Sequence, residues 1–159
     1  MPGWAVVGAR KRRLYVMSWS AMLHGSVMNG WVEAVDQDVP HAVLGGLVRQ
    51  ALAQSKTNVP MPNFRSPESP TNALLAAAGV TSYNGYAMSA REVCVDLDDE
   101  VPGFLITPTR NGGAREGWVR LDELSIRLGR EITEEQLGQS IREALDLAVG
   151  RPPSAWRGR

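Results

Sequence analysis

The chain has few of the side chains that metal sites and disulfide frameworks require. Its 159 residues include one cysteine, Cys94, and two histidines, His24 and His41. A single cysteine cannot form a disulfide within the chain, and two histidines cannot by themselves complete a tetrahedral metal site. Such cysteine usage is typical of proteins from reducing compartments. We therefore expect a protein that holds no metal and no cofactor.

Long apolar runs are also missing from the sequence. No stretch approaches the roughly 20 apolar residues that span a bilayer. The apolar segment Ala5-Val6-Val7 precedes the basic cluster Arg10-Lys11-Arg12-Arg13, whereas a secretory signal places its positive charge first. We therefore expect a cytoplasmic protein that does not associate with membranes.

The usual catalytic combinations are scarce. A nucleophilic Ser, Cys or Thr needs a neighbouring base, and only His24 and His41 could serve as the usual base. Cys94 alternates with apolar residues, which favours a half-buried, unreactive thiol. The pairs Gly45-Gly46 and Gly112-Gly113 lack the lysine and spacing of a phosphate-binding loop. We predict that the protein has no catalytic residues and is not an enzyme.

The formal net charge is zero, because 17 basic residues balance 17 acidic ones, but the charges are unevenly distributed. The first 13 residues carry four basic residues and the tail from Arg151 carries three, with no acids in either segment. The remaining chain, residues 14–150, holds 10 basic and 17 acidic residues, a net charge of −7. Such a body attracts basic partners and repels nucleic acid through long-range fields. A soluble surface without any partner would have the same composition.

Length and composition favour a single domain. We expect residues 1–13 to form a disordered basic leader, residues 14–150 to form the domain, and residues 151–159 to form a disordered tail rich in proline and arginine. Alternation of apolar residues predicts strands at 14–19 and 30–35, joined as a hairpin through the turn signal Asn29-Gly30.

Three segments are predicted to be helices. Helical spacing of apolar residues marks 41–54, where Gly45 and Gly46 suggest a close approach of helix and sheet. After a proline-rich loop at 56–69, Ser69 can cap a helix that stops at Gly79. The segment Thr133-Glu134-Glu135-Gln136 fits a capping box and starts a helix ending at Gly150.

A meander of strands occupies the region between the last two helices. The segment 92–97 has a buried face of Val93, Val95 and Leu97 and a wetter face of Glu92, Cys94 and Asp96. Strands at 104–107 and 118–121 follow, separated by a turn at 111–113, while 122–129 suits either a strand or a short helix. The resulting class is α/β of the α+β type: one domain, mainly an antiparallel sheet, with about three helices packed against it.

Acidic side chains cluster at two of the predicted turns. We take these as candidate contacts with a basic partner, from charge alone: Asp98, Asp99, Glu100, Asp122 and Glu123. Paired carboxylates could instead perform acid–base chemistry within a pocket, which would make the protein a small hydrolase or transferase. The basic ends could alternatively serve a nucleic-acid-binding accessory protein, through weak and salt-sensitive contacts.

Two helices share the pattern L-G-x-x-[VI]-R-x-A-L, at Leu44–Leu52 and Leu137–Leu145. Two helices packed on one sheet need similar apolar stripes, and a single pair does not define a repeat protein. Together with the strand pair, the proline-rich loop, Tyr83 with Tyr86 and the meander, these helices resemble the CdiI-type immunity proteins of contact-dependent growth inhibition (CDI) systems. The resemblance covers about residues 14–148.

The resemblance implies a partner and an activity. Immunity proteins of this kind bind, in the cytoplasm, the toxic C-terminal domain that a neighbouring bacterium delivers, and this domain is often an RNase that attacks tRNA. Binding blocks the toxin's active site or substrate surface. Such families vary the contacting residues on a shared scaffold, so the resemblance implies no particular interface position. An acidic body suits a nuclease that carries basic surface for RNA.

Overall fold

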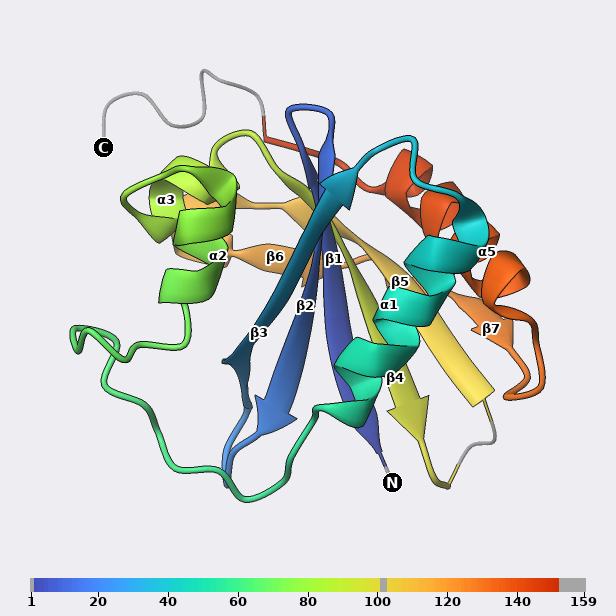
Figure 1. Ribbon diagram of the computed structural model, residues 1–159, viewed down its shortest axis with the longest axis horizontal. Coiled ribbons are helices and arrows are strands. Elements are labelled where there is room, and N and C mark those ends of the chain that lie inside the picture. The colour runs from blue at the N-terminus through green and yellow to red at the C-terminus, as the bar shows by residue number, and fades with distance from the viewer. Residues whose placement is uncertain (1, 101–102, 152–159) are drawn as a thin grey trace.

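One antiparallel sheet forms the centre of the molecule. The computed structural model describes residues 2–100 and 103–151. The strands run in the order β3-β2-β1-β4-β5-β6 (Figure 1). β6 pairs with residues 109–111 of β5, and β7 pairs with residues 104–106 of the same strand. Their bounds are β1 (Gly3–Arg10), β2 (Arg13–Ala21), β3 (Ser26–Asp36), β4 (Arg91–Asp98), β5 (Gly103–Asn111), β6 (Trp118–Arg120) and β7 (Ile126–Leu128). The antiparallel α+β class predicted from the sequence is confirmed.

The three expected helices are present, together with two short ones. The helices are α1 (His41–Ala53), α2 (Asn72–Ala78), α3 (Tyr83–Ala87), α4 (Gly113–Glu116) and α5 (Glu134–Leu147), with a 3₁₀ turn η1 (Asp122–Leu124). The capping box of α5 forms as predicted, with both hydrogen bonds between Thr133 and Gln136. Gly79 follows α2 in the left-handed conformation. The segment 122–129 contains both alternatives, because η1 precedes strand β7.

The prediction of a disordered leader at 1–13 is wrong. Residues 3–10 form β1, the strand between β2 and β4 in the sheet, and Val7 is fully buried. The basic cluster is a tight turn in which Arg10 pairs with Arg13, while Lys11 and Arg12 have φ values of 48° and 65°. The apolar run before the cluster is therefore a core strand, because burial in the sheet outweighs the unfavourable turn. The predicted disordered tail lies outside the described residues, apart from Arg151.

The first two predicted strands do pair, but the turn lies elsewhere. β2 and β3 are antiparallel neighbours joined through Met22–Gly25, so Asn29-Gly30 is inside β3 rather than at the turn. Opposite Asn29-Gly30, the pairing register of β2 shifts between Met17 and Trp19. Gly30 has a φ of 94° there. The Asn29 amide donates to the hydroxyl of Ser18 at 2.7 Å. The turn signal thus marks a bulge, which also requires a positive φ.

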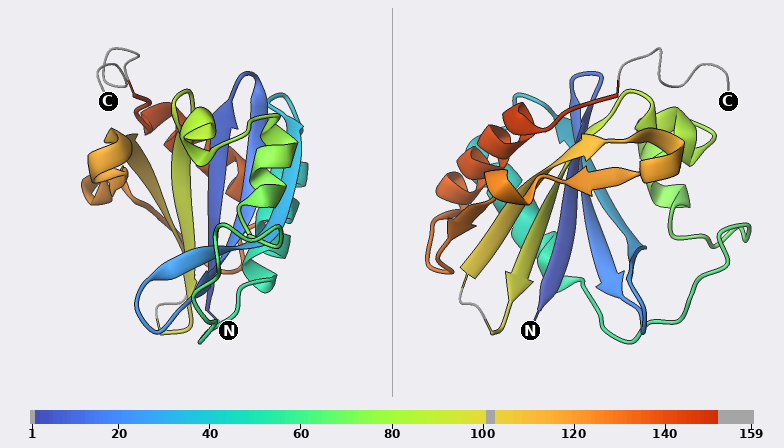
Figure 2. Two further views of the ribbon diagram at one scale, coloured as in Figure 1. Left: turned by 90° about the vertical axis from the view of Figure 1, so that its left-hand side faces the viewer. Right: turned by 180° about the vertical axis from the view of Figure 1, so that it is seen from behind.

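The two faces of the sheet are covered differently (Figure 2). On one face α1 and α5 enclose a core that includes Val7, Val16, Val93 and Ile106, all with no exposed surface. On the other face a smaller cluster joins Leu74 of α2 and Tyr86 of α3 to β1 and β2. β6 and α4 lie across the same face farther along the sheet. No helix in the described part of the chain is long and apolar enough to cross a bilayer.

The glycines of α1 serve a different contact from the one predicted. We expected a close approach between helix and sheet, but the close contact is between α1 and α5. A β-carbon on Gly45 would lie 1.9 Å from the carbonyl oxygen of Glu134, and one on Gly138 would lie 1.9 Å from that of His41. Each helix therefore needs a glycine where the other crosses it.

Candidate protein-binding face

Part of the second face of the sheet is open and concave. There the side chains of β1, β2, β4 and β6 enclose a hollow of about 520 Å³. We call it the tryptophan hollow and define it by Trp4, Trp19, Trp118, Glu92, Asp96 and Arg120. All three tryptophans are partly buried residues in the lining of the hollow. The sequence predicted strand positions for Trp19 and Trp118, which is confirmed, but it placed Trp4 in a disordered leader.

Strand register brings these side chains together. Trp4 lies directly opposite Trp19 of β2 and, on its other side, opposite Asp96 of β4. Since alternate residues of a strand share a face, Val6 and Cys94 form the next row on the same surface. Sequence spacing alone cannot place Trp4 beside Asp96, because the two residues are far apart in the chain.

Glu92 is the functional candidate that the sequence pattern misplaced. Its alternation with apolar residues predicted a wet position, but α3 covers it and leaves it 4% exposed. The hydroxyl of Tyr86 donates to Glu92 Oε2 at 2.9 Å. Burial raises the pKa of Glu92 from 4.5 to about 7, although this hydrogen bond opposes the shift. The sequence offered one signal of this burial. Tyr83 and Tyr86 lie shortly before Glu92 in the chain, and two aromatic side chains can cover a neighbouring strand.

Cys94 lies on the same face as a half-buried free thiol, as the sequence predicted. Burial raises its pKa to about 12, an effect that the Arg120 guanidinium opposes. The thiol is therefore protonated at neutral pH, whereas only the deprotonated thiolate acts as a nucleophile or a metal ligand. The residue contributes apolar surface to the hollow rather than reactivity.

Arg120 connects the hollow to the second predicted acidic group. Its guanidinium lies 2.6 Å from the Asp96 carboxylate and 3.5 Å from that of Asp122, and it also donates to Thr107 Oγ1 at 3.1 Å. These ion pairs are partly exposed, and such pairs typically contribute about 1 kcal/mol or less to stability. Their main consequence is geometric, because they hold Asp122 at the rim of the tryptophan hollow.

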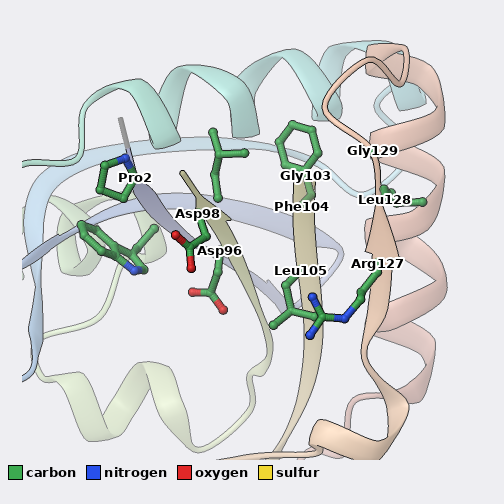
Figure 3. A pocket seen from close by; sticks show the side chains of 11 residues that line it. Pro2, Asp96, Asp98, Gly103, Phe104, Leu105, Arg127, Leu128 and Gly129 are labelled. Atoms are coloured by element: carbon green, nitrogen blue, oxygen red, sulfur yellow. The ribbon is translucent and has the colours of Figure 1, made fainter. Parts of the chain in front are cut away.

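A second hollow of about 500 Å³ adjoins the first along β4. We call it the acidic-turn hollow and define it by Trp4, Asp96, Asp98, Phe104, Leu105 and Arg127. Figure 3 shows the Asp96 and Asp98 carboxylates on one side of β4, with Leu105 and Arg127 beyond them. Trp4 and Asp96 line both hollows, so the two hollows adjoin each other at these side chains.

All five predicted contact residues are exposed, as the turn positions suggested. Asp99 pairs with Arg130 at 3.1 Å, and the Asp98 carboxylate accepts the main-chain N–H of Glu100 at 2.9 Å. Across the described residues, no hydrogen bond or ion pair joins the 98–100 group directly to Asp122 and Glu123. The structure places one group beside each hollow, with Asp96 and Arg120 between them.

Other potential catalytic groups are dispersed. His24 is exposed in the β2–β3 turn, while His41 starts α1 and lies 2.6 Å, Nδ1 to guanidinium, from Arg142. Within residues 2–100 and 103–151, no group of three or more His, Cys, Asp or Glu side chains could hold a metal ion. Of the carboxylates of the acid–base alternative, Asp98 lines the open acidic-turn hollow beside Asp96, while the others lie on exposed turns.

The basic turn between β1 and β2 forms a separate recess of about 400 Å³. It lies at the opposite end of β1 from Trp4. Arg10 donates to Ser89 and to the carbonyl of Ala78, so its guanidinium stabilises the fold in addition to contributing positive charge to this recess. Two acids, Asp38 and Asp146, also line it. The basic residues that the sequence assigned to a flexible arm are therefore held in an ordered turn.

Comparison with known proteins identifies this architecture. A family model described as "CDI immunity protein" matches residues 3–148. A protein of unknown function from Neisseria meningitidis has a similar structure, with a TM-score of 0.75 and 22% identity over 93% of this chain and 96% of that one. A "CdiA-CT/CdiI toxin and immunity complex" from Yersinia pseudotuberculosis contains a chain with a TM-score of 0.74 and 17% identity, over 93% and 98% of the two chains. At these identities the structures establish a shared fold. No curated protein sequence matches the chain.

Proposed function

The chain belongs to the CDI immunity protein family, and on this premise we propose that it binds and neutralises the cognate C-terminal toxin domain of a CDI system in the cytoplasm. The match over residues 3–148 carries the proposal, because it spans the whole described sheet and α5. The complex from Yersinia pseudotuberculosis supports it, since a protein of the same fold is there paired with a toxin.

The charge distribution supports a finer proposal about the partner. We propose that the toxin is a nuclease, with tRNA as the candidate substrate, because a nuclease presents basic surface to its substrate. The exposed acids beside the two hollows would steer such a surface toward this face: Asp98, Asp99, Glu100, Asp122 and Glu123. Neutralisation then follows from covering the basic surface that the nucleic acid needs.

Co-expression tests the proposal directly. Immunity genes lie directly beside their toxins, so the partner is the C-terminal domain encoded immediately upstream. Cells that express this domain should die without the present chain and grow with it. The controls are a version of the gene with an early stop codon and an immunity protein from an unrelated system. Continued killing, together with no complex between the purified proteins, would contradict the proposal.

The nature of the toxin is tested separately. Purified toxin domain should degrade RNA or DNA in vitro, and addition of the immunity protein in equimolar amount should stop the degradation. If growth is rescued but no nucleic acid is cleaved, the immunity function stands and the nuclease assignment is wrong.

A further inference from the structure

We propose that the tryptophan hollow receives a cationic side chain, lysine or arginine, from the bound toxin domain. The inference rests on the proposed immunity function and adds the position and chemistry of one contact. It assigns a role to Trp4, Trp19 and Trp118, which the charge-based choice of contacts left out.

The aromatic walls provide the first argument. Trp4 and Trp19 are cross-strand neighbours on one side of the hollow, and Trp118 lines it from β6. The Trp118 indole N–H donates to the hydroxyl of Tyr83 at 2.9 Å, which fixes the orientation of its ring. Tryptophan faces attract cations, and a cation over an indole gains roughly 0.5–2 kcal/mol, most where water is excluded. Tryptophan is also enriched among the residues that dominate binding energy.

The charges that face the hollow provide the second argument. Two carboxylates line it, Glu92 and Asp96, and Arg120 is the cation. Arg120 is already engaged by Asp96 and, at the rim, by Asp122. Asp96 and Asp122 therefore share one arginine, while buried Glu92, whose pKa is raised to about 7, carries only part of a negative charge at neutral pH. An entering cation would find uncompensated negative charge, whereas an entering anion would be repelled.

The hollow is large enough for a long side chain together with part of the segment that carries it. Its volume of about 520 Å³ falls within the roughly 300–1,000 Å³ of pockets that bury drug-sized ligands. The acidic-turn hollow adjoins it at Trp4 and Asp96, so the rest of the partner segment would lie over the 98–100 turn. An apolar anchor would fit the same space but would leave the excess negative charge of the two carboxylates around Arg120 uncompensated.

Fluorine NMR can locate the contact. The immunity protein is labelled with 5-fluorotryptophan, and each resonance is assigned with single Trp→Phe variants. Unlabelled, inactive toxin domain from the upstream gene is then added. We expect the signals of Trp4, Trp19 and Trp118 to shift. Trp31 is the internal control, because it packs against the core on the α1 and α5 face. A complex in which the three hollow signals do not move would overturn the proposal.

Charge changes at the rim test the sign of the occupant. Ser26 lines the hollow and is exposed, so substitution there spares the core. Ser26→Lys should weaken toxin binding about tenfold or more, corresponding to about 1.4 kcal/mol, while Ser26→Glu should leave binding equal or stronger. Asn63→Lys and Asn63→Glu, at an exposed position in the long loop, should change affinity little. Equal weakening by both Ser26 variants would mean an uncharged occupant and would overturn the cationic assignment.

The two levels of the inference fail in different ways. Absence of any complex by calorimetry contradicts the proposed function itself. A tight complex with unchanged hollow resonances, or with affinity insensitive to the sign of charge at residue 26, contradicts only the contact proposed here.

Discussion

Gly45 of α1 and Gly138 of α5 occupy equivalent positions in a reciprocal contact between the two helices. The missing side chain of each glycine makes room for a main-chain carbonyl of the other helix's first turn, that of Glu134 or His41. Both residues belong to the pattern L-G-x-x-[VI]-R-x-A-L. The pattern therefore records a helix pair that packs with approximate two-fold reciprocity, and not a repeated domain.

The arginines of the same pattern complete this reciprocity. Arg49 of α1 donates to the carbonyl of Ile132, just before α5 begins, at 2.7 Å. Arg142 of α5 donates to the carbonyls of Gln37 and Val39, just before α1 begins. Each arginine thus secures the segment that leads into the partner helix.

Adjacent glycines in α1 should respond oppositely to alanine. A β-carbon at Gly45 meets main chain at 1.9 Å, whereas one at Gly46 first meets the movable Glu134 carboxylate at 3.3 Å. Gly45→Ala should lower the free energy of unfolding by several kcal/mol, within or above the range of about 1–3 kcal/mol typical of overpacking. Gly46→Ala should be neutral or stabilise by up to about 1 kcal/mol through helix propensity. Urea denaturation measures both, and similar destabilisation by the two variants would contradict the crossing geometry.

Removing the Arg142 guanidinium should loosen the start of α1. Arg142→Met keeps the apolar stem but loses the hydrogen bonds to Gln37 and Val39, at a cost of about 1–3 kcal/mol. Amide hydrogen exchange should accelerate in the first turn of α1 more than in the centre of the sheet. Arg65→Met, at an exposed site in the long loop, is the control. Unchanged exchange and stability would show that these hydrogen bonds contribute nothing net.

Glu92 should make stability fall as pH rises. Its folded pKa of about 7 exceeds the ordinary 4.5, so between these values the folded state retains a proton that the unfolded state releases. The stabilisation is complete below about pH 4.5 and is lost by about pH 7. With about 1.4 kcal/mol per pKa unit, wild type should lose about 2 kcal/mol relative to Glu92→Gln between pH 5 and pH 8.

Urea denaturation at the two pH values gives this double difference. Exposed Glu33 of β3 offers a matched control, because Glu33→Gln should leave the pH dependence of wild type unchanged. If the free energies of wild type and Glu92→Gln run parallel from pH 5 to pH 8, the raised pKa of Glu92 is wrong.

Reversing the exposed acids should slow association with the toxin domain. The triple variant Asp98→Lys, Glu100→Lys and Glu123→Lys should reduce the association rate constant about tenfold or more at low salt, because steering depends on the local field. The effect should shrink as salt shortens the Debye length, which is about 10 Å at 0.1 M. Stopped-flow mixing at several salt concentrations measures it.

A control of equal charge separates local steering from net charge. Glu68→Lys, Glu143→Lys and Asp146→Lys change the same number of exposed acids, in the long loop and on α5. If both triple variants slow association equally, the two acidic groups have no special place in the interface.

Several elements could be predicted because their signals are local. Val93, Val95 and Leu97 alternate because one face of β4 meets the main core, and the reciprocal bonds of Thr133 and Gln136 lie within one helical turn. The leader was misjudged because Lys11 and Arg12 take positive φ values in a turn that normally favours Asn and Gly. Asn29-Gly30 misled in the opposite sense, because a bulge and a turn both need such a residue.

The candidate site was less accessible from the sequence than the fold. Turn positions correctly indicated the exposure of Asp98 and Glu123, since charged residues beside tight turns remain solvated. The pattern could not reveal that α3 buries Glu92 or that Arg120 reaches both Asp96 and Asp122. Those relationships depend on which segments lie across the second face of the sheet.

By itself, the sequence determined the α+β class, the three main helices, the meander and the resemblance to an immunity family, because strand alternation, helical periodicity and capping act between near neighbours in the chain. Only the tertiary structure decided that β1 lies between β2 and β4, and so put Trp4 beside both Trp19 and Asp96. The physical reason is that cross-strand neighbours follow from strand order. Strand order is settled by burial of apolar surface over the whole domain, and no short segment encodes it.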